Sequence, residues 1–417
     1  MREMKDSGIG WVHEIPIDWD VIRGKYLFSN DKMLVGAKVE EYERLALTMK
    51  GVVKRSKDDT DGLQPDKFNT YQILKTGELV FKLIDLQNIS TSRVGLSPYT
   101  GIVSPAYIIL KGNEQILSEY AEKYYLMMWM NQVFNALGDS GVRSSLNVGE
   151  LLDLSLPLPS IEEQRRIAFF LDRECGKIDL ITADIEKQIE ILEQYKRSVI
   201  QTVVSRGLDY SVALWESKVK YVGSIPHHWE VKRGKYIFSY TQKPVKENDG
   251  VITCFRDGEV TLRSNRREEG FTVSEKEIGY QGIDVGDLIV HGMDGFAGAI
   301  GISDSRGKAS PVLNNLMTAH CKKYYMYYLR NMAYRGVFIS LSTGIRVRTC
   351  DTNWGKLREI YYAVPPLKEQ QAIADYLDKK CAEIDVVIAD KKEQLDILEN
   401  YKKSIIYEYV TGKKEVM

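Results

Sequence analysis

The residue types that could carry catalysis do not assemble into a familiar catalytic motif in this sequence. Gly24-Lys25 and Gly355-Lys356 resemble the end of a phosphate-binding loop, but no Ser or Thr follows either pair to complete it. Pro365-Pro366 lacks the preceding Asn or Asp and the following aromatic residue of an amino-methyltransferase site. No glycine-rich strand-to-helix loop suits S-adenosylmethionine. We therefore expect that the chain is not an enzyme.

Nuclease and metal chemistry have equally little support. Glu216-x-Lys218 is the nearest match to the acid-x-Lys half of a nuclease site, but we predict that it lies in a linker. His227-His228 adjoin a repeated segment and are interpreted as structural or solvated. The five cysteines are odd in number and widely scattered, which argues against a disulfide framework and against zinc. We expect no catalytic residue, metal or cofactor in this chain, and metal-dependent cleavage by the chain alone would contradict this.

Basic residues in loops rich in Gly, Asn and Asp are the better functional candidates. Arginine can bind a guanine edge in bidentate fashion, whereas lysine and serine more often contact the sugar–phosphate backbone. The first half of the chain offers Lys54, Arg55, Lys82, Arg93, Arg143, Ser144 and Ser145, and the second half offers Arg256, Arg263, Arg266, Arg267, Lys308, Arg346 and Arg348. Arg143 and Arg346 are preferred because each follows a Gly-x turn. A solvated surface role is the alternative for each residue.

Composition allows nucleic-acid binding without indicating it. The 417 residues include 57 Lys and Arg and 58 Asp and Glu, for a net charge of −1. The 44% hydrophobic and 28% charged content is typical of a globular protein of two or three domains. No apolar run approaches the roughly 18 residues of a membrane span, and Met1–Asp6 lacks the apolar stretch of a secretory signal. We expect a cytoplasmic protein.

An internal repeat determines the predicted organisation. Residues 159–204 align without a gap to residues 365–410, and 21 of the 46 positions are identical. A second repeat opens each half, where Ile15-Pro16, Trp19 and Arg23-Gly24-Lys25-Tyr26 return as Ile225-Pro226, Trp229 and Arg233-Gly234-Lys235-Tyr236. The material between these repeats has diverged. The pattern predicts two copies of one fold with different surfaces, and simple drift after duplication is the alternative. We interpret the repeated opening as a structural strand with a core tryptophan, beside which Arg23, Lys25, Arg233 and Lys235 contact phosphates.

The repeated segments are predicted to be long helices. Apolar residues recur at steps of three and four, with Ile181 and Tyr195 among them, and Ser160-x-x-Glu163 has capping-box spacing. We predict that the two helices pair antiparallel as a coiled coil through Ile178, Ile185, Ile189, Leu192, Ile384, Leu395 and Leu398. Lys391 takes the place of Ile185 in the second copy. Packing of each helix on its own domain is the alternative.

The expected fold class is mixed α+β, with a pseudo-twofold internal repeat. The predicted division is a globular unit at 1–156, a central helix at 157–208, a second globular unit at 209–364 and a distal helix at 365–417. Each unit should contain a largely antiparallel sheet. The expected strands are 78–83, 107–110, 250–254, 287–291 and 359–364, and the expected helical interludes are 114–136 and 316–342.

The order of these motifs resembles the specificity subunit of type I restriction–modification systems over essentially the whole chain. The most specific element is Glu-Gln-x-x-Ile-Ala-x-x-Leu-Asp at 163–172 and again at 369–378. The opening Met4–Gly8 and the Ile-Pro-x-x-Trp segments fit as well. The second copy departs from the first where Pro366 replaces Ser160 and where Lys391 interrupts the helix seam.

The resemblance implies a sequence-specific DNA-binding subunit with two target-recognition domains separated by the helices. Each domain would bind one half of a bipartite, asymmetric site in double-stranded DNA, and the helices would fix the gap. Two methyltransferase subunits and the restriction or motor subunits would be the partners. S-adenosylmethionine, ATP and Mg would belong to those partners. The alternative is a coiled-coil interaction scaffold whose two heads bind ligands or proteins.

Overall fold

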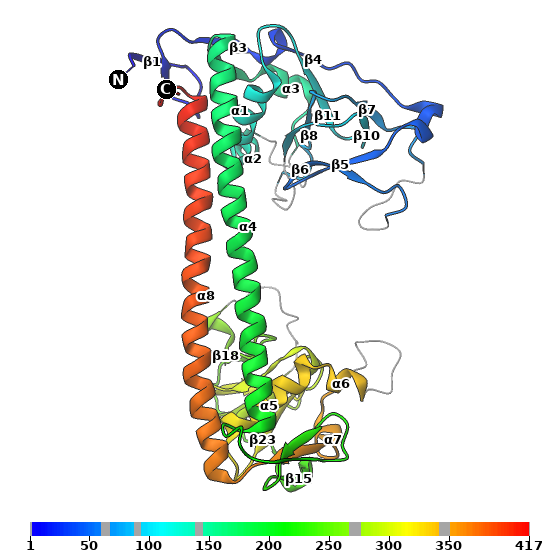
Figure 1. Cartoon of the computed structure of the whole chain (residues 1–417), viewed down its shortest axis with the longest axis vertical. Coiled ribbons are helices and arrows are strands. Elements are labelled where there is room, and N and C mark those ends of the chain that lie inside the picture. The colour runs from blue at the N-terminus through cyan, green and yellow to red at the C-terminus, as the bar shows by residue number, and fades with distance from the viewer. Residues whose placement is uncertain are drawn as a thin grey trace. The chain divides into compact units, whose positions relative to one another are not determined.

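The chain forms two compact units of mixed α and β structure (Figure 1). The computed structural model describes residues 2–59, 67–86, 93–137, 145–266, 277–341 and 351–416. Unit 1 comprises Met1–Glu186 and Lys392–Met417, and unit 2 comprises Lys187–Lys391. The predicted mixed α+β class is confirmed. The units divide both long helices, whereas the predicted four segments keep each helix whole, so those segment boundaries stay a prediction.

Unit 1 is built on two four-stranded sheets, with strand orders β4-β11-β8-β9 and β6-β5-β10-β7. Its strands are β1 (Met4–Asp6), β2 (Glu14–Pro16), β3 (Asp20–Arg23), β4 (Phe28–Ser29), β5 (Arg44–Thr48), β6 (Gly51–Arg55), β7 (Gln72–Leu74), β8 (Leu79–Phe81), β9 (Val94–Leu96), β10 (Gly101–Val103), β11 (Ile108–Gly112) and β12 (Ser155–Leu158). Its short helices are η1 (Gly24–Tyr26), η2 (Gly36–Glu41), α1 (Ser118–Met130), α2 (Val133–Leu137) and α3 (Val148–Asp153). Among these described strands, β5 and β10 pair in parallel and the other pairs are antiparallel.

Unit 2 repeats this plan, with β16-β23-β20-β21 as its four-stranded sheet. Its strands are β13 (Leu214–Glu216), β14 (Ser224–Pro226), β15 (Glu230–Arg233), β16 (Ser239–Thr241), β17 (Ile252–Cys254), β18 (Val260–Leu262), β19 (Gln281–Ile283), β20 (Leu288–His291), β21 (Ile300–Ile302), β22 (Gly307–Ala309), β23 (Leu313–Met317) and β24 (Tyr361–Val364). Its short helices are η3 (Gly234–Tyr236), η4 (Arg263–Asn265), η5 (Gly295–Ala297), α5 (Lys322–Tyr334), α6 (Val337–Ser340) and α7 (Trp354–Leu357). The helical interlude predicted from residue 316 begins too early, because that residue lies in β23.

The two predicted long helices are present as α4 (Ile161–Arg206) and α8 (Leu367–Val410). In unit 1, Lys402 bonds to Asp179 at 2.5 Å, and the rings of Phe170 and Tyr409 lie 4.3 Å apart. In unit 2, Lys196 bonds to Asp385 at 2.6 Å. These two ion pairs occupy equivalent positions of the internal repeat. Residue numbers run in opposite directions along the two helices, so the predicted antiparallel pairing is confirmed within each unit.

The seam between the helices agrees with most of the predicted positions. Ile178, Ile185 and Ile384 are buried, and Ile189, Leu192, Leu395 and Leu398 are half-buried. Including Ile181 and Tyr195 in the buried stripe was wrong, because these side chains are 49% and 50% exposed. A stripe spaced by three and four residues is wider than the narrow seam that two paired helices bury. In the part of the chain that the structure describes, no helix is long and apolar enough to cross a membrane.

A buried glutamine fastens the first turn of each long helix to its globular unit. Gln164 accepts a hydrogen bond from the Leu117 amide at 2.8 Å and donates to the Gln115 and Pro159 carbonyls. Gln370 accepts from the Cys321 amide at 3.0 Å and donates to the Pro365 carbonyl at 2.8 Å. Both side chains are fully buried. The Glu-Gln motif is therefore a joint between helix and domain.

The glutamate of the same motif binds the repeated tryptophan. Trp19 donates its indole N–H to Glu163 at 3.0 Å, and Trp229 donates to Glu369 at the same distance. Both indoles are buried, which confirms the interpretation of the opening repeat as structural. The predicted capping box is only half formed: Ser160 Oγ accepts from the Glu163 amide at 3.3 Å, while the Glu163 carboxylate binds Trp19. Burying the tryptophan stabilises the fold by more than a reciprocal cap would stabilise a helix that is already long.

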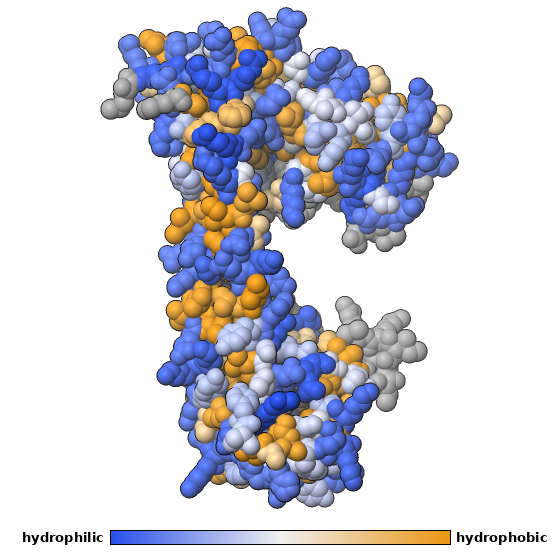
Figure 2. All heavy atoms as spheres, in the orientation of Figure 1, coloured by the Kyte–Doolittle hydropathy of each residue, from blue (hydrophilic) through white to orange (hydrophobic). Residues whose placement is uncertain are grey.

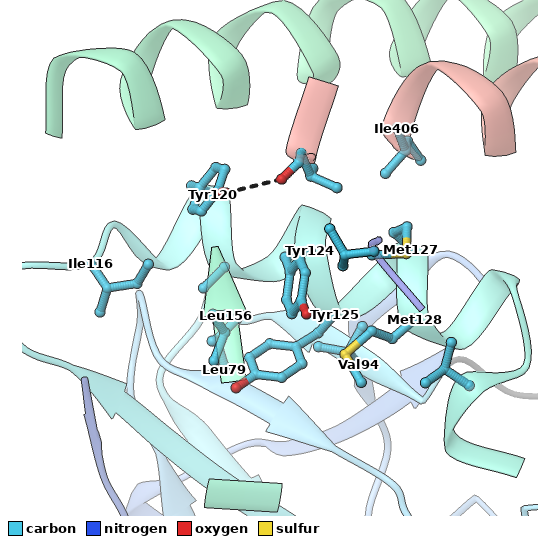
Figure 3. Close-up of a cluster of buried hydrophobic side chains, with 14 of the residues drawn as sticks. Leu79, Val94, Ile116, Tyr120, Tyr124, Tyr125, Met127, Met128, Leu156 and Ile406 are labelled. Carbon is cyan, nitrogen blue, oxygen red and sulfur yellow. Dashed lines mark hydrogen bonds between the residues drawn. The ribbon is translucent and has the colours of Figure 1, made fainter. Parts of the chain in front are cut away.

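The core of unit 1 joins α1 to the end of α8. Figure 3 shows Tyr120, Tyr124 and Tyr125 of α1 among aliphatic side chains from β8, β9 and α8. The dashed line there is the hydrogen bond from the Tyr120 hydroxyl to the Val410 carbonyl, 3.2 Å long. In unit 2, Tyr324 donates to the Val204 carbonyl in the same way, at 3.3 Å. Each globular core thus contains the last turn of the long helix that arrives from the other half of the sequence.

A network of charged side chains fixes the β17–β18 hairpin of unit 2. Arg306 binds Asp249, just before β17, with bonds of 2.7 and 3.0 Å, and it binds Asp284 at 2.5 Å. Lys243 bonds to Asp284 at 2.7 Å and to Asp287 at 2.6 Å. Hydrogen bonds from Lys243 and Arg306 hold the pKa of Asp284 down at about 2, and Arg306 also lowers the pKa of Asp249.

We predict that removing a joint glutamine destabilises its unit. Gln370→Ala leaves the Cys321 amide and the Pro365 carbonyl without their buried partner, and each lost partner costs about 1–3 kcal/mol. Urea unfolding followed by circular dichroism measures the loss. Gln371→Ala is the matched control, because Gln371 is exposed and should change stability by less than about 0.5 kcal/mol. Equal stability of the two variants would contradict the joint.

We also predict an acid-sensitive contribution to stability from Asp284. Its folded pKa lies below its ordinary value, so its contribution is present above about pH 5 and disappears as the pH falls toward 2. Asp284→Asn should therefore lower the urea midpoint at pH 7, and the gap between variant and wild type should close between pH 5 and pH 2. A gap that stays constant over this range would show that the charge of Asp284 does not matter.

Candidate nucleic-acid interface

Unit 2 brings three of the predicted arginines to one cavity. Arg256 follows β17, while Arg263 and Arg266 lie at η4 after β18, and all three line a hollow of about 730 Å³. The ends of β20 and β23 contribute its other walls. The β17–β18 hairpin positions these side chains: Arg256 lies in its turn, and Arg263 lies beside Val251 at its open end. The Arg266 side chain bonds back to Asp257 and Glu259 of the turn. The cavity is therefore the strongest candidate site in unit 2.

Each arginine at this cavity has a protein partner. Arg256 bonds to Asp294 at 2.8 Å. Arg266 bonds to Asp257 at 2.6 Å and to Glu259 at 2.9 Å. The Arg263 Nε donates to the Thr253 hydroxyl at 3.4 Å. Sequence reasoning missed these acids: Asp257 and Glu259 adjoin the hairpin turn, whereas Asp294 comes from a distant segment that only the fold brings close.

The remaining candidates of unit 2 lie apart or outside the described residues. Lys308 is on β22, mostly buried, and bonds to Glu277 at 2.6 Å. It bridges to Val251 at the start of the hairpin, so it borders the cavity region. Arg267, Arg346 and Arg348 fall outside the residues that the structure describes. Their predicted roles stay predictions.

Unit 1 places Lys54 and Arg55 on the hairpin that corresponds to β17–β18. Lys54 bonds to Glu43 at 2.6 Å and lies 5.2 Å from the centre of the Tyr99 ring, and Arg55 bonds to Asp59 at 2.6 Å. A hollow of about 390 Å³ beside them is also lined by Glu40, Glu41 and Glu43. The two units thus present basic residues from matching hairpins in different acidic surroundings.

A second group of candidates meets in unit 1. The Leu146 amide donates to the Leu83 carbonyl at 2.9 Å, and Ser145 bridges to Ile84, which brings Ser145 near Lys82 and Arg93. Arg93 is fully buried and donates to the Ile84 and Asp85 carbonyls at 3.4 and 2.8 Å. Arg93 therefore stabilises the backbone at Ile84 and Asp85 from the interior of the unit.

Burial lowers the pKa of both Lys82 and Arg93, and the neighbouring Arg93 charge lowers that of Lys82 further. Placing a second cation beside a buried one costs electrostatic free energy, which an anion bound nearby would relieve. Arg143 and Ser144 lie outside the described residues.

The alternative catalytic residues have structural partners. The Glu216 carboxylate accepts from Ser224 at 2.8 Å within the β13–β14 hairpin, and His228 bonds to Glu369 at 2.8 Å. Among the described residues, no group of three or more His, Cys, Asp or Glu could hold a metal ion. The four described cysteines are free thiols.

The repeated basic residues of the opening strands also pair with acids. Lys25 bonds to Asp153 at 3.1 Å, and Arg233 bonds to Glu359 at 3.4 Å. Close packing requires Gly234, because a Cβ there would lie 2.2 Å from the Leu357 carbonyl oxygen, and a Cβ at Gly24 would lie 3.1 Å from the Leu152 carbonyl oxygen. Phosphate contacts by Arg23, Lys25, Arg233 and Lys235 stay a prediction.

Large apolar side chains are exposed on the long helices at repeated positions. Figure 2 shows hydrophobic side chains gathered over these helices. In unit 1 they are Leu180, Ile181, Ile397 and Tyr401, and in unit 2 they are Val386, Val387, Ile191 and Tyr195. Each member of one set is the repeat equivalent of a member of the other. Exposed apolar residues at matching places are candidates for a partner-binding surface in each unit.

Comparison with known proteins agrees with these features. Residues 45–191 match the family model of the type I restriction modification DNA specificity domain. The chain is 24% identical over its whole length to a putative type I restriction enzyme MjaX specificity subunit of Methanocaldococcus jannaschii, and it covers 97% of that protein. The chain is also 25% identical to the type I restriction enzyme MjaVIII specificity subunit of the same organism. That match spans 137 residues, which are 33% of this chain and 30% of that protein.

A solved structure has a similar fold. A solved chain from work on complex assembly and conformational transition of the type I R-M system superposes with a TM-score of 0.67 at 13% identity, covering 96% of this chain and 99% of that one. The resemblance seen in the repeated motifs is therefore confirmed: residues 45–191 match the type I DNA specificity domain, and the whole chain is similar to a type I specificity subunit in sequence.

Proposed function

We propose that this chain is a non-catalytic subunit that reads a bipartite, asymmetric site in double-stranded DNA, one half with each unit. The observation that carries the proposal is the contrast between framework and loops. The Trp–Glu bond, the Gln joint and the Tyr–carbonyl bond recur in both units with nearly the same lengths. The basic candidates lie in segments that differ. A common frame with unlike contact loops suits two readers of unlike sequences.

The contact chemistry supports base reading in unit 2. Arg256 bonds to the Asp294 carboxylate at 2.8 Å, which restricts its orientation before a ligand arrives. A preorganised guanidinium loses less freedom when it binds the O6 and N7 acceptors of guanine. In unit 1, Lys54 and Arg55 on the matching hairpin are the corresponding candidates.

We infer that two copies of a methyltransferase subunit dock on the exposed helix positions, and that restriction or motor subunits complete the assembly. Ile191 and Tyr195 in unit 2 have their equivalents Ile397 and Tyr401 in unit 1, with exposures between 50% and 59%. Two matching apolar surfaces fit two copies of one protein better than two different partners. S-adenosylmethionine, ATP and Mg would then be held by those partners.

The function is tested by mapping methylated bases in the host genome. We expect a two-part motif with a fixed unspecified gap, which loses its methylation when the gene for this chain is deleted and regains it on complementation. A methylation pattern that does not change on deletion would contradict the proposal and favour the scaffold alternative.

Independent reading is tested with one substitution in each unit. In the assembled complex, Arg256→Ala should relax one base position by about 1–3 kcal/mol, or reduce the slope of log affinity against log salt by about one unit if Arg256 contacts phosphate. The effect should be confined to one half of the site. Lys54→Ala should act only on the other half. If neither substitution changes the slope or the base preference, these residues lie outside the interface.

Partner stoichiometry is tested by native mass spectrometry. Tyr195→Glu places a charge in the apolar surface of unit 2 and should leave a complex with one methyltransferase copy instead of two. Adding Tyr401→Glu should remove the second copy. Gln194→Glu introduces the same charge on a neighbouring face of α4 and should keep both copies. Retention of two copies by the double variant would refute this docking surface.

A further inference from the structure

The cavity of unit 2 has a volume that contact with the edge of a stacked duplex does not require. It measures about 730 Å³ and reaches the buried side chains of Ile252, Cys254 and Leu313. This volume is within the range of about 300–1,000 Å³ found for small-ligand sites. The surface of a double helix is convex, so protein side chains that project from the surface of the protein contact its base edges. A concave site is filled only by a group that protrudes into it.

The charge around the cavity is compensated. Among the residues that line it, the guanidinium groups of Arg256, Arg263 and Arg266 are accompanied by the carboxylates of Asp257 and Asp294. Glu259, just outside, also binds Arg266. A phosphate would have to compete with these carboxylates for the guanidinium groups. A neutral ring that needs both donors and acceptors would find both in place.

Arg266 provides a flat surface at this site. Its guanidinium carbon lies 4.1 Å from the centre of the Phe255 ring, and Asp257 and Glu259 hold the group from its edge at 2.6 and 2.9 Å. A guanidinium fixed in plane and supported by an aromatic ring can stack on an unpaired base with its other face.

His291 adds a hydrogen-bond donor. Its Nδ1 accepts from the Met293 and Asp294 amides at 3.2 and 3.0 Å, so the remaining proton is assigned to Nε2. Burial lowers the pKa of His291, which favours the neutral ring at physiological pH. Asp294 supplies acceptor oxygens at the same wall.

We propose that this cavity binds a single nucleobase. Donors from His291 and Arg256, acceptors from Asp294 and the flat face of Arg266 match the edge and the ring of a base. The base could come from a nucleotide swung out of the half-site read by unit 2, which rests on the proposed function, or from a free nucleotide. The hollow on the matching hairpin of unit 1 is smaller, about 390 Å³, and three glutamates line it, so the property is assigned to unit 2 alone.

The duplex arm of the test uses the complex with its methyltransferase subunits and the mapped site. Each nucleotide of the half-site read by unit 2 is replaced in turn by 2-aminopurine or by an abasic analogue. We expect one position at which 2-aminopurine emission rises severalfold on binding and an abasic analogue weakens binding about tenfold. Asp294→Asn and Arg266→Lys should abolish the emission rise there. They should leave unchanged any rise at the bases to be methylated.

The free-nucleotide arm titrates AMP, GMP, CMP and TMP into the same complex without DNA, observed by saturation-transfer NMR. If no duplex position responds but a free nucleotide binds and Asp294→Asn abolishes this binding, the cavity is a site for a free nucleotide. Both variants preserve side-chain size, and unchanged circular dichroism checks their fold. No response in either arm overturns the proposal. If the complex binds its DNA site but neither arm responds, only the proposal that the cavity binds a base is refuted. If the complex does not bind the methylated site specifically, the proposed function is refuted.

Discussion

The buried amide at the start of each long helix is the interaction on which the rest of the structure depends. Gln164 and Gln370 have no exposed surface, and each joins a helix turn to the backbone that precedes α1 or α5. A side-chain amide has both donor and acceptor, so it fixes the orientation of the helix as well as its contact. Apolar packing alone would allow the helix to slide or rotate. The direction in which each helix leaves its unit is therefore specified by hydrogen bonds.

A tyrosine hydrogen bond in each core links the two halves of the sequence. Each globular core includes the last turn of the other half's helix, bound through the Tyr120 or Tyr324 hydroxyl to a main-chain carbonyl. The ion pairs Lys402–Asp179 and Lys196–Asp385 set the register of the helix pair at equivalent positions. Unit 1 is therefore assembled from two segments, Met1–Glu186 and Lys392–Met417, whereas unit 2 is the continuous segment Lys187–Lys391, which begins inside α4. This interdependence explains why the helices kept their sequence while the loops diverged.

The sequence was sufficient for the helices, the repeat and most of the seam, because a long apolar period and a gapless alignment survive without knowledge of the fold. It failed at Ile181 and Tyr195, since periodicity does not distinguish a helix surface that faces the second helix from one that is exposed. It also missed Asp294, which reaches Arg256 only through the sheet. The joint glutamines appeared in the sequence as a motif, but their partners, the Leu117 and Cys321 amides, lie some 50 residues away and carry no side-chain signal.

The near-neutral charge of the chain agrees with the pairing of its candidate arginines with carboxylates. A cation already bonded to a carboxylate releases fewer counterions when it meets a phosphate, so it adds little to sequence-independent affinity. The same bond fixes the guanidinium for a base edge and penalises a wrong base, because the arginine would then be desolvated without a new partner. In the proposed function, Arg256 with Asp294 therefore favours discrimination over affinity. A reader of this kind needs partners that supply the general attraction to DNA, in line with the proposed docking of two copies of one protein on its helices.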